Sequence, residues 1–127
     1  MGDMDEVLAY LAAGLVGLWG VSHAIPTRQV VAGFEPTTRD NRLVITQEWL
    51  AEAFTMWGLA AAVVVATAVG GANSDVTVWL YRVVAALLVA IAALTALTGA
   101  RTPVVWFKIC PVLLSSSAAL LVVASLA

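Results

Sequence analysis

Four ionisable side chains of this sequence lie in or beside long apolar stretches, where a charge is costly and often functional. Glu48 and Glu52 stand four residues apart, His23 lies near the end of one apolar run, and Lys108 lies near the start of another. A carboxylic acid and a base in such a place can donate and remove protons near neutral pH. We therefore take Glu52 as a candidate catalytic acid, with Glu48 or His23 as the base or proton relay.

Structural explanations exist for the same residues and stay open at this stage. An ion pair between Glu52 and Lys108 would lock two helices together without any chemistry. Thr46 is suited to cap a helix that begins after it, and an acidic residue in the first turn, here Glu48, is favoured by the helix dipole. His23 is equally well explained as a hydrogen-bonded histidine at the membrane interface.

Further residues are expected to contact a bound molecule because they share a helix face, or one end of the helices, with these ionisable groups. They are Lys108, Thr55, Trp19 and Trp49. No metal and no other cofactor is predicted, because a chain with one histidine and one cysteine supplies a His/Cys metal site poorly.

The elements that must position these residues follow from composition. Apolar residues make up 62% of the 127 residues and charged residues 11%, whereas soluble domains are about 45–50% apolar and about 25% charged. This composition excludes a soluble enzyme, a disordered chain and a nucleic-acid binder with a basic face. A single cysteine excludes a disulfide scaffold. The chain is expected to be a membrane protein in contact with the lipid bilayer.

Four apolar runs are long enough to cross the bilayer as helices, for which about 20 residues suffice. Pro26, Gly70, Gly99 and Pro103 mark the breaks between them. The prediction is an all-α, polytopic four-helix bundle that forms one integral-membrane domain over residues 1–127. The acidic start of the chain is unlike a signal peptide, so we expect the first run to be retained. The predicted spans are residues 7–25, 47–69, 76–97 and 104–126.

The distribution of basic residues predicts the orientation in the cell membrane, because cytoplasmic loops carry an excess of lysine and arginine. Arg82 alone lies near the side that holds both termini. Both termini are therefore expected outside the cell, with loops 26–46 and 98–103 in the cytoplasm. The basic residues on the cytoplasmic side are Arg28, Arg39, Arg42, Arg101 and Lys108.

Helical periodicity predicts which faces are buried, since residues spaced by three or four share a face. Each ionisable residue shares a face with small residues, which let membrane helices approach closely. Leu87, Leu88, Leu94, Phe54 and Trp57 are expected to face lipid. The faces expected in the interior are Ala9, Ala12, Val16, Trp19 and His23; Glu48, Glu52, Thr55, Leu59, Ala62 and Ala66; Arg82, Ala85, Ala86, Val89, Ala93 and Ala96; and Lys108, Val112, Ser115 and Ala119.

Two segments, GVSHAIPT at residues 20–27 and QEWLAEAFTMWG at residues 47–58, resemble the small DoxX-like membrane proteins. The resemblance covers mainly the first half of the chain and implies four spans with polar residues near one end of the first two helices. This group is functionally mixed, so it transfers no site residues. Small multidrug-resistance transporters share the length and span number but carry their key glutamate in the first span, which here has no acidic residue.

Three functions are compatible with this pattern. The first is an enzyme that isomerises, cyclises or opens an epoxide in a lipophilic small molecule by acid–base chemistry. The second is a proton-coupled small-molecule transporter, which at this size would need a homodimer. The third is a non-catalytic partner or assembly subunit, and no function involves nucleic acid. A closed pocket at Glu52 favours the enzyme, a through-path the transporter, and a filled core the subunit.

Overall fold

Turn residues divide the chain into long apolar helices joined by short connections. The computed structural model describes residues 2–126, and within that range every regular element is helical. Four helices are long and apolar enough to cross a membrane, which confirms the predicted four-helix membrane fold. The elements are α1 (Gly2–Ala24), α2 (Thr27–Ala32), α3 (Arg39–Gly70), α4 (Asp75–Leu97), the 3-10 turn η1 (Gly99–Arg101) and α5 (Val105–Ala124).

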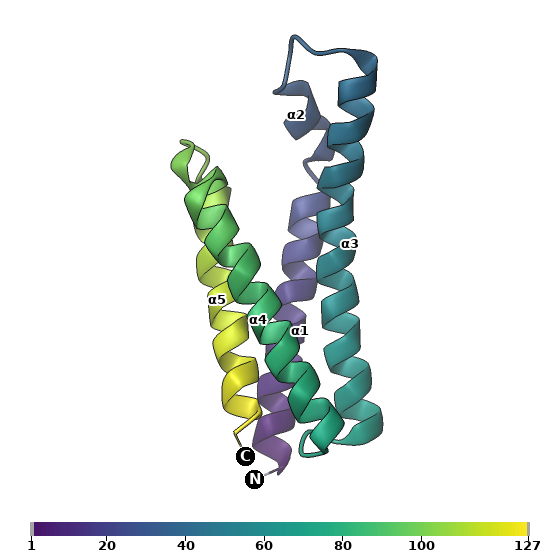
Figure 1. Cartoon of the computed structure of the whole chain (residues 1–127), viewed down its shortest axis with the longest axis vertical. Coiled ribbons are helices and arrows are strands. Elements are labelled where there is room, and N and C mark those ends of the chain that lie inside the picture. The colour runs from purple at the N-terminus through teal and green to yellow at the C-terminus, as the bar shows by residue number, and fades with distance from the viewer. Residues whose placement is uncertain (1, 127) are drawn as a thin grey trace.

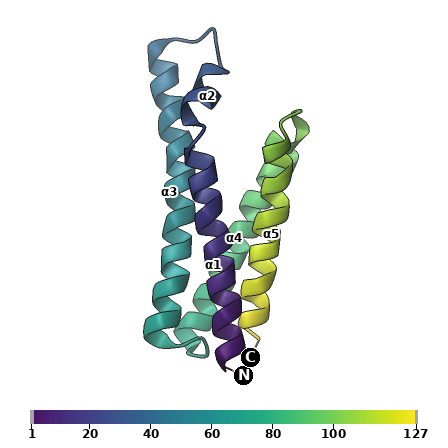
Figure 2. The ribbon, with the colours of Figure 1, turned by 180° about the vertical axis from the view of Figure 1, so that it is seen from behind.

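The four long helices form two pairs that spread apart toward one end. Figures 1 and 2 show α1 beside α3 and α4 beside α5, with the pairs closest where the chain begins and ends. We call this the terminal end; it also holds the turn between α3 and α4. The opposite end, which holds α2 and η1, is called the α2 end. The structure thus places both ends of the described chain on one side of the bundle, as an even number of spans requires.

Side-chain size explains the spreading. At the terminal end α1 buries Ala9, Ala12 and Ala13, and α5 buries Ala118 and Ala124, so their backbones can approach closely. Toward the α2 end the same faces carry rings instead. The rings that lie there are those of Trp19, His23, Trp49 and Phe107.

Helix α3 begins earlier than the hydropathy pattern predicts. Thr38 caps it by accepting a hydrogen bond from the Asn41 backbone N–H at 3.1 Å. The expected capping role of Thr46 is therefore wrong: its hydroxyl donates to the Arg42 carbonyl within the helix at 2.8 Å. Glu48 consequently lies well inside α3 and gains nothing from the helix N-terminus. Hydropathy marks where a helix crosses lipid, whereas the cap marks where the helix starts.

Hydrogen bonds between hydroxyls join α3 to α4 at the terminal end. The Tyr81 hydroxyl and the buried Thr67 hydroxyl are 2.5 Å apart, and Thr67 itself donates to the Val63 carbonyl at 2.7 Å. Thr77 donates to the Ala66 carbonyl at 3.1 Å. These contacts hold the start of α4 against the last turns of α3, so the two helices form a tight hairpin there.

The predicted buried face is confirmed on α1, where Ala9, Ala12, Val16, Trp19 and His23 are all buried. On α3 the buried face is displaced by one residue, about 100° around the helix, and Glu52 lies at its edge. Phe54 and Trp57 are exposed, as expected. The residues that α3 buries are Ala53, Met56, Val63 and Thr67.

On α4 and α5 the predicted faces are wrong. Ala85 is buried, but Ala86, Val89 and Ala93 are exposed, and Leu88 is fully buried in their place. On α5 the expected interior residues Val112, Ser115 and Ala119 are exposed, whereas Cys110, Leu114 and Leu121 are buried. Leucine is as soluble in lipid as in a protein core, so hydropathy does not tell which face of these two helices is buried.

The cations on these two helices do not mark the interior either. Arg82 reaches the C-terminus of α5, where its Nη2 donates to the Ser125 carbonyl at 3.1 Å, and its guanidinium lies 5.0 Å from the centre of the Trp79 ring. Lys108 is exposed and donates to the Ala100 carbonyl at 3.2 Å. Both cations satisfy carbonyls near helix ends, as long basic side chains commonly do.

Candidate functional site

The structure brings together two of the three candidate catalytic residues, His23 and Glu52. His23 lies in the last turn of α1 and Glu52 on the facing side of α3, with Nε2 and Oε2 3.5 Å apart. The contact has the distance of an ion pair but not the geometry of a hydrogen bond. An acid and a base from separate helices thus meet at the α2 end.

The imidazole of His23 is held by aromatic contacts. The ring of Trp49 stacks on it, with centroids 3.9 Å apart and planes 15° from parallel. The Trp49 indole N–H donates to the His23 carbonyl at 2.8 Å, which satisfies a carbonyl at the C-terminus of α1 that has no helical partner. Phe107 of α5 packs edge-on against Trp49 at 6.1 Å. Three helices therefore position the histidine.

Exposure differs sharply between the two partners. The His23 side chain is 7% exposed and the Glu52 side chain 37%. The His23 Nε2 is buried and has no hydrogen bond within residues 2–126. A proton that reaches this nitrogen from outside therefore has the Glu52 carboxylate as its nearest carrier.

Behind the pair lies Trp19, one turn earlier on the buried face of α1. Its indole N–H is buried and makes no hydrogen bond within the described part of the chain. The Cys110 thiol lies beside it, 4.0 Å from the Thr95 hydroxyl, and sulfur is a weak acceptor. The inner wall of the site is therefore formed by an indole ring and a thiol.

The remaining candidate residues lie apart from this pair. Glu48 is exposed beside Gln47, and Thr55 is exposed and donates to the Ala51 carbonyl at 2.8 Å. Helical geometry explains this: positions 49, 53 and 56 face α1, whereas positions 48 and 55 lie on the far side of Glu52. Lys108 turns toward η1 and donates to the Ala100 carbonyl, so of the alternatives for a partner of Glu52 it is His23, not Lys108, that lies within reach.

Sequence reasoning missed Phe107, Cys110 and Thr95 as neighbours of the site. Phe107 directly precedes Lys108, and the charge of the lysine, not the ring, marks this position in the sequence. For the site as a whole the sequence does carry a signal: Trp49 and Glu52 are three residues apart, which places a ring and a carboxylate on adjoining parts of one face of α3.

The level of the pair in the membrane follows from helix lengths. The 19 residues from Glu52 to Gly70 span about 28 Å at a rise of about 1.5 Å per residue, close to the thickness of a bilayer core. His23 is likewise one residue from the end of α1. A hydrocarbon layer that begins at Gly70 would therefore end near Glu52, and α3 continues about 20 Å past this residue.

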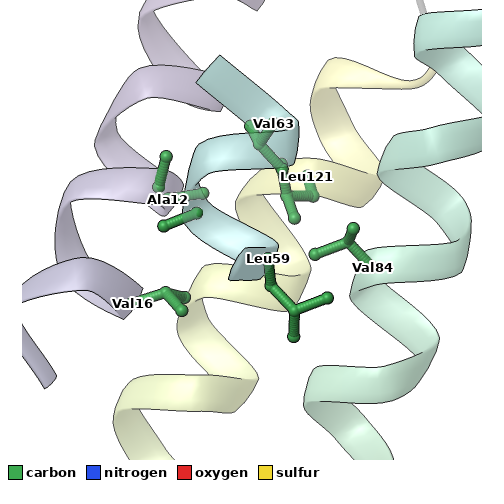
Figure 3. A pocket seen from close by; sticks show the side chains of 8 residues that line it. Ala12, Val16, Leu59, Val63, Val84 and Leu121 are labelled. Atoms are coloured by element: carbon green, nitrogen blue, oxygen red, sulfur yellow. The ribbon is translucent and has the colours of Figure 1, made fainter. Parts of the chain in front are cut away.

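Neither of the two hollows found in the bundle is lined by His23 or Glu52. The first has about 160 Å³ of empty space and is entirely apolar. Figure 3 shows side chains from all four long helices pointing into it, among them Val16, Leu59, Val84 and Leu121. The second, about 500 Å³, lies between α2 and the start of α3. The His23–Glu52 pair accordingly forms an edge of the bundle, and neither hollow is the closed pocket at Glu52 that would favour an enzyme.

No family model, curated protein or solved structure matches this chain. The resemblance to the DoxX-like proteins therefore stays a prediction. Within residues 2–126, no three His, Cys, Asp or Glu side chains gather as a metal site would need. The function has to be argued from the geometry of the His23–Glu52 pair.

Proposed function

We propose that the protein performs acid–base chemistry on a lipophilic small molecule at the His23–Glu52 pair. The observation that carries this proposal is the contact of a buried, unpartnered His23 Nε2 with a partly exposed Glu52 carboxylate. Glu52 is the group that a molecule arriving from the membrane can touch. His23 is the positioning and relay residue behind it.

The chemistry of an isomerisation illustrates the division of labour. The Glu52 carboxylate removes a proton from one carbon of the bound molecule and returns a proton to another, so the net change is zero. Between the two transfers His23 takes the proton from Glu52 across the 3.5 Å contact and gives it back, so both residues end in the state in which they began. The rings of Trp19, Trp49 and Phe107 favour an apolar molecule, because they provide flat apolar surface around the pair.

The α2 end is proposed to face the cytoplasm. Arg28, Arg39, Arg42, Arg101 and Lys108 all belong to elements at this end, and such an excess of basic residues is typical of cytoplasmic loops. The pair would then lie at the inner edge of the membrane, where a lipophilic molecule enters from the inner leaflet.

A non-catalytic partner subunit is the second candidate, and the packed core favours it. Met56, Leu88, Leu114 and Leu121 are almost fully buried in the middle of the bundle, and the apolar hollow beside them has no polar lining residue. The same packing argues against a transport path through a single copy. In a subunit the His23–Glu52 pair would only set how α1 meets α3.

Deuterium incorporation separates the two candidates for any substrate that exchanges a carbon-bound proton. Purified protein is incubated in D2O with a lipid extract of its source membrane, and the masses of the lipophilic molecules are then measured by mass spectrometry. An isomerase or cyclase exchanges such a proton with its acid or base, so a specific molecule gains deuterium.

The matched variants are Glu52→Gln and Glu48→Gln, the same change one helical turn apart on α3. Glu52→Gln keeps the shape but carries no exchangeable acid, so it should abolish deuterium uptake. Glu48→Gln should leave uptake unchanged, because Glu48 is exposed and distant from His23. Equal uptake in the wild type and in Glu52→Gln would reject the acid–base function and leave the subunit.

A further inference from the structure

The hollow between α2 and the projecting start of α3 is separate from the His23–Glu52 pair and has its own chemistry. It has about 500 Å³ of space, open solvent included, and its polar lining residues are Thr27, Arg28, Glu35, Arg42 and Thr46. Val31 and Ala32 of α2 provide apolar lining. Two guanidinium groups, one carboxylate and two hydroxyls are thus collected in one place, and the Thr27 hydroxyl is already donated to the Ala24 carbonyl.

The charges in this hollow do not cancel. Glu35 is committed to its neighbours: its Oε1 accepts from the Arg42 Nη1 at 2.6 Å, and its Oε2 accepts from the Thr37 backbone N–H at 3.3 Å. Arg28 has no ion pair and no hydrogen bond from its side chain within residues 2–126. The hollow therefore presents one uncompensated guanidinium and the remaining N–H groups of a second one.

A guanidinium fork matches the oxygens of a phosphate group better than any other anion donor set in proteins. The Thr46 hydroxyl already donates to the Arg42 carbonyl, so its oxygen remains only as an acceptor. The groups free to donate to a phosphate are therefore those of Arg28 and Arg42.

The position of the hollow indicates that the phosphate belongs to a lipid headgroup. Arg28 lies four residues beyond the end of α1, which is the level of lipid headgroups if α1 crosses the bilayer. Ile25, three residues before Arg28 and therefore nearer the end of α1, is 78% exposed. An exposed apolar side chain on the membrane side of a basic hollow can contact an acyl chain, whereas a free phosphate makes no apolar contact.

We propose that this hollow binds the phosphate group of an anionic phospholipid through Arg28 and Arg42. The headgroup lies between α2 and α3, and an acyl chain runs past Ile25 toward the hydrocarbon layer. Basic pockets of this kind at membrane interfaces recognise anionic headgroups in other membrane proteins. This proposal is independent of the acid–base function.

The test uses the full chain in nanodiscs that contain either phosphatidylglycerol or phosphatidylcholine. Native mass spectrometry after release from the nanodisc counts the lipids that stay bound. We expect retained phosphatidylglycerol in excess of phosphatidylcholine, and a decrease of about fivefold in Arg28→Gln, the effect of removing one interfacial cation. Arg28 is exposed, and its side chain has no hydrogen bond or ion pair within the described residues, so this variant should fold normally.

The matched control is Arg101→Gln, which removes an exposed arginine from η1 at the same end of the bundle. Arg101→Gln should retain phosphatidylglycerol as the wild type does. Equal losses in both variants would show that only general surface charge acts, and the proposal would be wrong. A third result would also contradict the proposal: if neither lipid is preferred and excess inorganic phosphate displaces phosphatidylglycerol, the hollow binds free phosphate and not a phospholipid.

Discussion

The contact between α1 and α3 depends on Gly20, and Gly20→Ala tests it. A Cβ atom at this position would lie 2.6 Å from the Trp57 Nε1 and 3.3 Å from the Ala53 carbonyl oxygen. The indole ring has to move, and its hydrogen bond to the Gly17 carbonyl at 3.2 Å is then lost. Overpacking of this kind typically costs about 1–3 kcal/mol.

The matched control is Gly14→Ala on the same helix, where a Cβ atom meets nothing within 4 Å. Both substitutions gain the same helix propensity, so their difference isolates the steric effect. Unfolding by SDS in mixed micelles, followed by far-ultraviolet circular dichroism, gives the two free energies. We expect Gly20→Ala to be less stable than Gly14→Ala by about 1–3 kcal/mol.

A third variant makes the reasoning refutable in detail. Trp57→Leu removes the ring that collides with the new methyl group, so Gly20→Ala should cost much less when introduced into Trp57→Leu. Equal stability of Gly20→Ala and Gly14→Ala would show that α1 and α3 do not approach as closely as the structure has them. An undiminished cost in the Trp57→Leu background would assign the effect to the Ala53 carbonyl instead.

Three further predictions use the same assays. Tyr81→Phe should destabilise the bundle by about 1 kcal/mol, the usual value of a buried hydrogen bond, because Thr67 loses its partner on α4; a neutral result would contradict the role of this contact. Lys108→Met should leave stability and deuterium uptake unchanged, because Lys108 contacts only the Ala100 carbonyl; lost activity would bring Lys108 back into the site. In a Cys110→Ser background, a membrane-impermeant thiol reagent should label Asn73→Cys but not Asn41→Cys on intact cells; the reverse pattern would invert the orientation.

The comparison of α1 with α4 shows what the sequence could predict about packing. On α1 the small residues Ala9 and Ala12 share a face with Trp19 and His23, and every one of them is buried. On α4 the same logic selected Ala86 and missed Leu88. A face of alanines is buried only where a second backbone approaches closely. The buried face of α4 combines Ala85 and Ala92 with Leu88, so residue size alone does not mark it, and the direction from which α5 approaches is a property of the whole bundle.

The candidate site, like the packing, could be predicted from the sequence only in part. The meeting of His23 and Glu52 follows from their positions near the same end of two adjacent helices. The turn of Lys108 toward η1 does not follow from its position, because its long side chain takes the nearest free carbonyl, that of Ala100. Phe107 occupies the place beside Trp49 that a charge pattern would assign to the lysine.

The spread of the two helix pairs gives the molecule the outline of a wedge, narrow at the terminal end and broad at the α2 end (Figures 1 and 2). Embedded in a bilayer, a wedge occupies more area in one leaflet than in the other. Lateral pressure in the crowded leaflet pushes the α1–α3 and α4–α5 pairs together, and Phe107, which crosses from one pair to Trp49 of the other, receives that force. A change in membrane curvature would in this way reach the ring that stacks on His23.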